Sequence, residues 1–446
     1  MSRATFASKI GMVAAAAGSA VGLGNIWHFP SETASGGGAL FIFVYLGCIL
    51  FFGIPLMVSE FIVGRASNAN AAGAFQKLAP GTKWKYVGRL AILTGLIIMG
   101  FYMVVCGWTL EFIFQSATGG LFGVSDFSAN FTQLLQSPIK QWILTVVFTL
   151  LTAFFVVSGV RKGIELSAKI MMPILFLLLI VLVIRALTLN GSSAGLEFLL
   201  KPNFQNFKPS VFIDAMGQSF FSLSLGMACM ITYASYFDKT ANLPKTALQV
   251  SVLDTLVALL AGLIIFPAAF ALASNQATIT DDLIEGGPGL LFITLPELFN
   301  QMPLSAVWST LFFILLAIAA LTSTISLMEV VTVYLHEEFN FSRRKSVLIV
   351  TIVVLVLGAF SSYSSDFFKV LDFATAKIML PVAGLFTSLF VGWYLDKKLV
   401  YAQLTNDGTL SFGVRFLKGY IFILRYLAPI AIMAIFIYGL LGQCVI

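Results

Sequence analysis

Long apolar stretches recur along the whole chain, and short polar gaps separate them. A helix that crosses a lipid bilayer needs about 20 predominantly apolar residues. Eleven stretches have this character, near residues 8–29, 38–63, 86–115, 139–157, 163–189, 211–237, 246–272, 304–336, 346–362, 370–396 and 419–442. The pattern predicts an all-α, polytopic membrane protein in which residues 1–446 form a single transmembrane domain.

Composition leads to the same fold class. The chain has 446 residues, of which 59% are hydrophobic and 10% are charged, whereas soluble domains are roughly 45–50% apolar and about 25% charged. In a soluble protein the formal charge of +6 would suggest a nucleic-acid partner. In this chain we attribute it to basic residues beside a membrane, and we expect neither a nucleic-acid partner nor an obligate protein partner. The four cysteines form no CxxC motif, so neither a disulfide framework nor a zinc site is indicated.

The distribution of basic residues predicts the orientation. If the N-terminus is cytoplasmic, 19 of the 26 lysines and arginines fall on the cytoplasmic side, five fall outside and two lie within apolar stretches. Cytoplasmic loops of membrane proteins carry such an excess of Lys and Arg. We therefore expect a cytoplasmic N-terminus and, with eleven crossings, a C-terminus outside.

Two of the apolar stretches carry helix-weakening residues at their centres. The first contains Ala20–Asn25, with glycines at 22 and 24, and the sixth contains Ser222–Ala228, with two serines and a glycine. Backbone groups released at this depth cannot be satisfied by lipid, so they must line a buried site. These glycines could instead only tighten helix packing. The chain can be divided into two five-helix halves, 8–189 and 211–396, followed by the stretch 419–442. The two weakened stretches occupy matching positions in these halves, which favours interrupted helices around a transport site.

Local sequence strings at these positions resemble a known family. The strings are Gly18–Trp27 followed by Phe29-Pro30, then Gly36–Ala39, Gly53–Leu56, Trp108–Leu110, Gln218–Phe221, Ile231–Tyr236 and Leu321–Ser323. They resemble the neurotransmitter:sodium symporter family, and specifically its bacterial LeuT-type amino-acid transporters with eleven helices. The resemblance covers nearly the whole chain and weakens in the tenth stretch. It implies the LeuT fold, with two inverted five-helix repeats plus one helix, helices 1 and 6 broken at the midplane, and a location in the bacterial inner membrane.

The resemblance also implies the binding residues. The substrate, a neutral and mostly hydrophobic amino acid, would contact Ala20, Leu23, Gly24, Asn25, Ile98, Tyr102, Phe221, Ser222, Ser224, Met227, Ser323 and Leu327. A first sodium ion would be bound by Ala20, Asn25, Ser222 and Asp254, and a second by Gly18, Val21, Ala319, Thr322 and Ser323. These residues offer carbonyl, hydroxyl and carboxylate oxygens, which hard cations prefer. For Thr322 and Ser323, hydrogen bonding between helices is the alternative interpretation.

Asp254 is a carboxylate inside an apolar stretch, and such residues are functional candidates by default. Animal relatives have a neutral Asn at this position and bind chloride nearby, using a serine one turn later. This chain has Ala258 at that turn. We therefore expect chloride-independent transport, in which the unpaired carboxylate takes up a proton after substrate release and the carrier returns with it. Glu60 is also within an apolar stretch, and the resemblance implies that it braces unwound backbone.

Gates and a hinge follow from the resemblance as well. Arg3, Glu337 and Tyr236, with Phe6 nearby, would form the inner gate, and Phe221 would close over the substrate with Tyr102. Gly163 and Pro173 in the fifth stretch would let that helix unwind locally.

Two positions depart from the family pattern. The outer-gate arginine is His28 here, and its acidic partner is Thr375, which puts the outer salt bridge in doubt. Ala228 stands where relatives often have Gly, and it is expected to narrow the side-chain pocket.

These observations predict a sodium-coupled importer that works by alternating access. A membrane receptor that binds an amino acid without moving it is the alternative. An intramembrane enzyme is not expected, because the two histidines, His28 and His336, lie near opposite faces and neither is near Asp254.

Overall fold

The computed structural model describes residues 5–121, 123–124, 126–204, 208–272 and 289–441, and within these ranges it contains helices and no strand. Nine of the helices in this part of the chain are long and apolar enough to cross a membrane. Five of them are single α-helices: α6 (Lys85–Ala117), α8 (Pro138–Val157), α13 (Leu243–Leu272), α16 (Ser305–Glu338) and α17 (Arg343–Tyr363). Two consist of consecutive helical segments in the first half of the chain: Ala39–Ser67 (α3, Ala39–Cys48; η2, Ile49–Gly53; α4, Ile54–Ser67) and Val160–Leu187 (η3, Val160–Glu165; α9, Leu166–Leu187). Two more lie near the C-terminus: Ser365–Tyr394 (α18, Ser365–Phe373; η6, Ala374–Met379; α19, Leu380–Leu389; η7, Phe390–Tyr394) and Arg415–Leu441 (α21, Val414–Phe422; η8, Ile423–Leu427; α22, Ala428–Leu441).

The two expected interruptions are present. Helix α1 (Lys9–Ala20) is followed by Gly24–Ser35 (η1, Gly24–His28; α2, Phe29–Ser35), and the two parts are bent by 56°. Helix α11 (Pro209–Ser222) is separated from α12 (Cys229–Ala234) by the turns of Leu223–Ala228. Ser224, Gly226 and Ala228 have φ of 53°, 78° and 65°, a left-handed conformation that a helix cannot contain. Among the described residues, the nine long helices and the bent pair of α1 with Gly24–Ser35 give up to ten candidate spans, and the sixth predicted stretch corresponds to α11 and α12.

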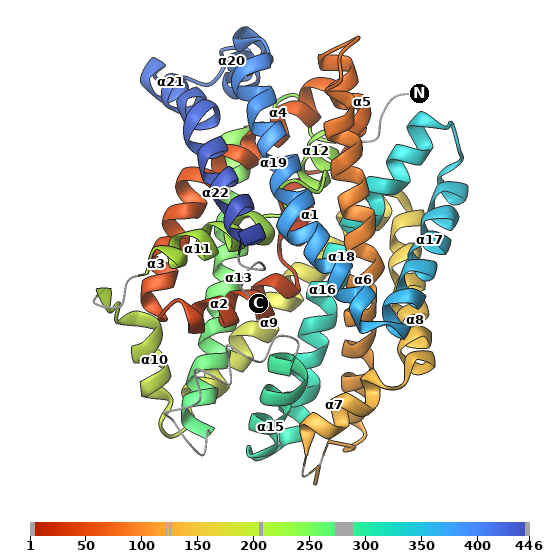
Figure 1. The fold of residues 1–446 in the computed structure, drawn as a ribbon, viewed down its shortest axis with the longest axis vertical. Coiled ribbons are helices and arrows are strands. Elements are labelled where there is room, and N and C mark those ends of the chain that lie inside the picture. Colours follow the sequence, from red (N-terminus) through yellow and green to blue (C-terminus); the bar gives the residue numbers. More distant parts are fainter. Residues whose placement is uncertain (1–4, 122, 125, 205–207, 273–288, 442–446) are drawn as a thin grey trace.

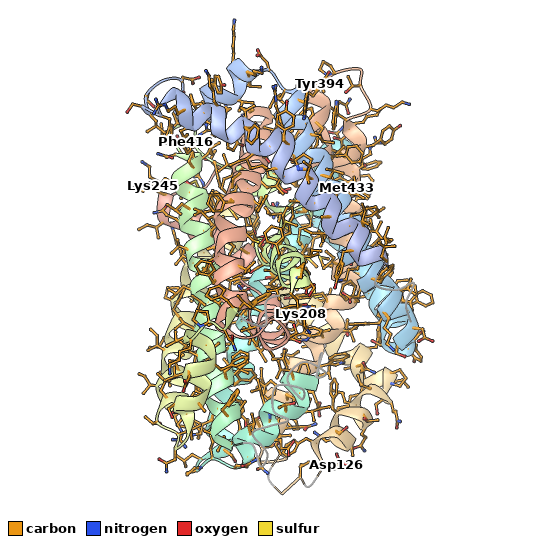
Figure 2. All side chains as sticks on the ribbon, turned by 60° about the vertical axis from the view of Figure 1, so that its left-hand side comes forward. Asp126, Lys208, Lys245, Tyr394, Phe416 and Met433 are labelled. Atoms are coloured by element: carbon orange, nitrogen blue, oxygen red, sulfur yellow. The ribbon has the colours of Figure 1, made fainter. Side chains whose placement is uncertain are left out.

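The helices stand roughly side by side, and the shorter helices mark the two ends of the bundle (Figure 1). Helices α5 (Ala71–Leu78) and α20 (Lys397–Thr405) lie at one end, which we call the α5–α20 end. Helices α7 (Phe127–Leu135) and α15 (Leu295–Asn300) lie at the other, the α7–α15 end. Figure 2 shows the same separation, with Tyr394 and Phe416 near one end and Asp126 at the other.

The surface of the bundle is apolar along its length. Large hydrophobic side chains such as Phe43, Phe51, Phe154, Leu177 and Ile430 are exposed. In water such a surface would drive aggregation, whereas lipid solvates it. The exposed apolar surface therefore agrees with a multi-pass membrane protein.

Two connections that the sequence analysis treats as loops contain helices. Residues 190–210 include α10 (Ser192–Leu200), which packs against α13. Of residues 273–303, the part 273–288 lies outside the described residues, and the rest forms η5 (Leu290–Thr294) and α15. Both helical pieces are too short to cross a bilayer, which is why a search for apolar stretches passes over them.

Close backbone contact between α4 and α12 gives a test of the packing. A Cβ atom on Gly64 would lie 2.1 Å from the Ile231 carbonyl oxygen and 2.9 Å from the Ala234 Cβ. We expect Gly64→Ala to destabilise the protein by about 1–3 kcal/mol, because backbone cannot move aside as a flexible side chain can. Thermal unfolding of the purified protein measures this. Gly47→Ala is the matched control, since its Cβ would meet nothing within 4 Å. An equal melting temperature for both variants would contradict the prediction.

Candidate functional site

A small cavity of about 40 Å³ lies between the two helix interruptions. Ten of the twelve predicted substrate residues line it, and Leu23 and Asn25 lie next to it in the chain without lining it. The lining residues are Ser19, Ala20, Gly22, Gly24, Ile98, Tyr102, Phe221, Ser222, Ser224, Met227, Cys229, Ser323 and Leu327. None of them carries a charged side chain, so the polar groups at the cavity are hydroxyls and main-chain groups.

Main-chain N–H groups of the first interruption are bonded to side chains next to the cavity, and the Gly22 N–H donates to the Asn25 Oδ1 at 2.9 Å. The Leu23 N–H donates to the Tyr102 hydroxyl at 3.1 Å, which fixes the tyrosine ring beside the break. A Cβ on Gly22 would lie 2.5 Å from the Ser323 Oγ, and one on Gly24 would lie 2.8 Å from a ring carbon of Phe221. A side chain at either position would force Ser323 or Phe221 to shift, so glycine allows these side chains to approach the backbone.

Three of the predicted sodium residues form a closed hydrogen-bonded set. The Asn25 Nδ2 donates to the Asp254 Oδ1 at 2.7 Å and to the Ser222 Oγ at 3.1 Å. The Ser222 hydroxyl donates to the other Asp254 oxygen at 2.7 Å. All three side chains are fully buried. The set joins η1, α11 and α13, and it brings carboxylate and hydroxyl oxygens together, whereas the Asn25 Oδ1 accepts a hydrogen bond from the Gly22 N–H at 2.9 Å.

The second predicted set also comes together, between α1 and α16. The Ser323 hydroxyl donates to the Val21 carbonyl at 2.9 Å, and the Thr322 hydroxyl reaches the same oxygen at 3.4 Å and the Ala319 carbonyl at 2.9 Å. A Cβ on Gly18 would lie 3.4 Å from the Thr322 Cβ. Since a hydroxyl oxygen keeps its lone pairs when its proton turns away, the same oxygens can surround a cation.

Buried polar side chains hold the interrupted backbone in place. The Glu60 carboxylate accepts a hydrogen bond from the Gly226 N–H at 2.8 Å, as expected for a residue that braces the sixth span. The Ser224 hydroxyl donates to the Ser19 carbonyl at 2.8 Å. The Gln218 side chain donates to the Gly24 carbonyl at 3.2 Å. Gln218 belongs to one of the strings that carry the resemblance, but no role is predicted for it from the sequence.

Phe221 separates the central cavity from a second, larger hollow. His28 contacts the Phe221 ring at 5.2 Å and stacks on Trp27 at 4.8 Å, measured between ring centroids. Phe221 also lines a hollow of about 160 Å³, together with His28 and four charged residues that the sequence analysis missed: Glu32, Asp214, Asp372 and Lys377. Thr375 is buried and bonds to carbonyls of its own helix. Because threonine has no charge, it cannot form an ion pair with His28, and the loss of the family's outer salt bridge stays a prediction.

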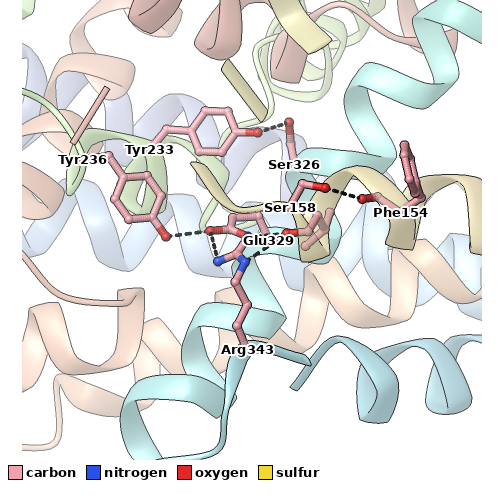
Figure 3. A network of polar contacts seen from close by, with 8 residues as sticks. Phe154, Ser158, Tyr233, Tyr236, Ser326, Glu329 and Arg343 are labelled. Atoms are coloured by element: carbon pink, nitrogen blue, oxygen red, sulfur yellow. Dashed lines mark hydrogen bonds and ion pairs between the residues drawn. The ribbon is translucent and has the colours of Figure 1, made fainter. Parts of the chain in front are cut away.

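The α5–α20 end is closed by a polar network. Arg343 and Glu329 form an ion pair of 2.5 Å, and the Tyr236 hydroxyl donates to the same carboxylate at 2.8 Å (Figure 3). The Arg343 guanidinium also donates to the Val156 carbonyl, at 2.6 Å from Nη2. The network connects α16, α17, α8 and the residues after α12. Of the expected inner gate, Tyr236 lies in this network, whereas Arg3 is outside the described residues.

Contacts of the other expected gate and hinge residues, Glu337, Phe6 and Gly163, are as follows. The Glu337 carboxylate accepts hydrogen bonds from the main-chain N–H and side chain of Asn70 at 2.8 and 3.0 Å. Phe6 makes edge contacts with the rings of Tyr233 and Tyr236, each at 6.0 Å. In the fifth span, a Cβ on Gly163 would lie 1.9 Å from the Phe155 carbonyl oxygen, so only glycine fits against α8.

A buried glutamate fastens the segment before α1 to this span. The Glu165 carboxylate accepts from the Ala7 N–H at 2.6 Å and from the Ser8 hydroxyl at 3.0 Å. It also pairs with Lys169 at 2.7 Å. Glu165 lies between Gly163 and Pro173, so a local unwinding of this stretch would release the start of α1.

The expectation for Ala228 needs correction. Ala228 does not line the central cavity, and its neighbour Cys229 does. With φ of 65°, Ala228 occupies the left-handed conformation that glycine adopts without strain. The position therefore constrains the backbone of the break.

Comparison with known proteins identifies the family of this chain. The family model "Sodium:neurotransmitter symporter family" matches residues 3–125 and 128–443. Uncharacterized sodium-dependent transporters of Bacillus subtilis (YhdH) and Haemophilus influenzae are 37% and 32% identical, over 97% and 98% of this chain and 96% and 98% of their own lengths. The crystal structure of MhsT in complex with L-phenylalanine superimposes with a TM-score of 0.88 at 39% identity, covering 98% of this chain and 100% of that one.

The family match, the interrupted spans and the all-helical membrane architecture point to one class of protein, a membrane transporter and not an enzyme. The chain belongs to the sodium:neurotransmitter symporter family.

Proposed function

We propose that this protein imports neutral, hydrophobic amino acids by coupling their movement to sodium, with the substrate bound in the central cavity. The observation that carries the proposal is the pair of oxygen clusters beside that cavity, Asn25–Ser222–Asp254 on one side and Val21–Thr322–Ser323 on the other. Each cluster offers a hard cation several oxygens in a water-poor site, which is the chemistry that sodium needs. Two sodium sites are therefore proposed.

The cavity lining supports the substrate class. Main-chain N–H groups at the interruption can bind a carboxylate, and Tyr102 lies beside them. Around the expected side-chain position, Ile98, Met227 and Leu327 are apolar, so a charged substrate side chain would remain unpaired there. The matched MhsT structure holds L-phenylalanine, which has an uncharged side chain.

The direction of transport follows from the orientation. Most basic residues lie at the α5–α20 end, and we propose that this end faces the cytoplasm. Phe221 would then close the outer side of the site, and the network of Tyr236, Glu329 and Arg343 would close the inner side. Alternating access requires that these two closures open in turn.

The proposal is tested by uptake into proteoliposomes. With an inward sodium gradient we expect accumulation of a neutral amino acid, and replacement of sodium by potassium or choline should abolish it. A receptor that binds without transport would bind the amino acid in a sodium-dependent way and show no accumulation. Undiminished uptake in sodium-free buffer would contradict sodium coupling.

The second oxygen cluster gives a sharper prediction. Thr322→Ala combined with Ser323→Ala removes two hydroxyls, and we expect the apparent sodium affinity to fall at least about tenfold, since a hydrogen-bonding group that interacts with a charge contributes roughly 1.5–3 kcal/mol. Thr324→Ala is the matched control: its hydroxyl is buried on the same helix but contacts Thr152 on α8. Sodium titrations of substrate binding measure the effect, and equal affinities in the two variants would exclude this site.

Selectivity is tested at the side-chain end of the cavity. We expect neutral amino acids, and not Lys, Arg, Asp or Glu, to compete for uptake. Ile98→Ala should shift preference toward larger side chains by about tenfold, because a methyl or methylene group in such a pocket is worth roughly 1–3 kcal/mol. Ile92→Ala is the control, since Ile92 is equally buried in α6 and does not line the cavity. If both variants keep the wild-type ranking, Ile98 does not set the size limit.

Asp254 should make chloride unnecessary. Its carboxylate offsets the positive charge of bound sodium in a low-dielectric site, and buried Ala258 one turn later offers no hydroxyl to an anion. We expect equal wild-type uptake in chloride and in gluconate. Asp254→Asn should slow the return of the empty carrier or make uptake anion-sensitive.

Two measurements separate the parts of this prediction. Strict chloride dependence of the wild type would contradict the role of Asp254. Internal pH, followed during sodium-driven uptake, tests the proposed outward movement of a proton, and no pH change would remove that part alone. Asp214→Asn is the control for loss of charge, because Asp214 is an acidic residue that lines the second hollow.

A further inference from the structure

Four charged side chains line the hollow of about 160 Å³ that lies beyond Phe221. Glu32 is on α2, Asp214 on α11, Asp372 on α18 and Lys377 in η6. Helices α2 and α11 pack against each other, and α22 packs against both α11 and η6. The hollow therefore places three carboxylates and one lysine between helices that are far apart in the sequence.

The lysine and the carboxylates share this hollow without direct pairing. Among the described residues, neither Lys377 nor Glu32 takes part in an ion pair. The charge of Lys377 nevertheless acts on the Glu32 carboxylate, and so does the negative charge of Asp214. Because opposite charges attract, a carboxylate that is repelled by a second one is stabilised when a cation approaches it. The hollow therefore contains an attraction between Lys377 and Glu32 that no direct contact uses.

The surroundings of Lys377 fix its stem and leave its charged end accessible. A Cβ on Gly439 of α22 would lie 3.3 Å from the Lys377 Cδ, so the stem packs along that helix. Lys377 as a whole is exposed, and its ammonium group lies at the end of a flexible four-carbon chain. The surrounding segment, η6, is a π-helical turn, and such turns inside α-helices are frequent at functional sites.

Glu32 is on the same helical stretch as the aromatic closure of the central cavity. It follows His28 by four residues, about one helical turn, within the helical stretch Gly24–Ser35. The His28 ring contacts the Phe221 ring at 5.2 Å. Lys377 belongs to a different span, the one that contains η6. A contact between Glu32 and Lys377 would therefore tie the closure at Phe221 to a separate part of the bundle.

We propose that Lys377 is the cation that holds the outer side closed: when the inner side opens, the hollow narrows and the Lys377 ammonium group pairs with the Glu32 carboxylate. This inference rests on the alternating access proposed above. Opening the inner side separates Glu329 from Arg343, which form an ion pair in the structure. An ion pair gained at the outer side would offset part of the cost of losing that one.

The first test is sodium-driven uptake into proteoliposomes. We expect K377Q and E32Q each to slow uptake about tenfold, since close charge pairs contribute at least roughly that factor, and K377R to retain most of the wild-type rate. K369Q is the matched control, because Lys369 is an exposed lysine of the same span that does not line the hollow. Exchanging the charges, K377E with E32K, should restore uptake at least about threefold over K377E alone, which a merely structural role of Lys377 would not produce.

The second test measures the closure itself and does not depend on the substrate. Spin labels are placed at S35C, at the end of α2, and at S365C, at the start of α18, both exposed positions. The three described cysteines are buried, and the fourth, Cys444, is replaced by serine. Pulsed electron paramagnetic resonance in nanodiscs then gives the distance between the labels. In sodium-free buffer, where bound sodium no longer stabilises the present arrangement, we expect a shorter second distance in the wild type, in K377R and in K369Q, but not in K377Q.

The outcomes separate this inference from the proposed function. Equal uptake by the wild type and K377Q overturns the role of Lys377, and so do identical distance distributions for these two proteins. A wild type without the shorter distance shows that the hollow does not close, which also overturns it. An equal loss of uptake in K369Q assigns the effect to general charge and not to this pair. Absence of sodium-driven uptake in the wild type overturns the proposed function instead, and the distance measurement still tests Lys377.

Discussion

The structure depends on the cost of interrupting a helix inside a membrane. Each interruption frees main-chain N–H and C=O groups, and lipid offers them no hydrogen-bond partner. Buried side chains supply the partners here: Tyr102 accepts from Leu23, and Glu60 accepts from Gly226. The site is therefore built from the same groups that make the interruptions tolerable, because the turns that release backbone also expose polar atoms at the centre of an otherwise apolar bundle.

The same constraint connects the two halves of the fold. Asn25 belongs to the first interruption, Ser222 ends the helix before the second, and Asp254 reaches both from α13. Since these groups are buried and bonded to one another, the geometry of one interruption depends on that of the other. A cation or substrate that reorganises this set changes the relative stability of the whole arrangement, which is the requirement for coupling between sites.

The sequence predicted the spans and both interruptions, because apolar length and centrally placed glycines are local features. Through motifs such as Gly22–Asn25, which belong to a known family, it also proposed substrate residues, and the structure brings ten of these together around one cavity. It did not predict the pairing of Glu329 with Arg343, which depends on how α17 returns beside α16. Lys377 was missed for a similar reason: the rotation of its helix decides whether it lines the hollow above Phe221.

The two proposed closures of the site consist of different kinds of interaction. On the α7–α15 side the closure is the Phe221 ring with His28 against it, and a ring can turn without breaking an ion pair. On the α5–α20 side the closure includes the ion pair of Glu329, fully buried, with Arg343. Removing one partner of such a buried pair costs about 3–5 kcal/mol, so separating the two without replacement is costly. Under the proposed alternating access, the α5–α20 side would therefore be the harder one to open, and water or new contacts at these charges would have to stabilise its open form.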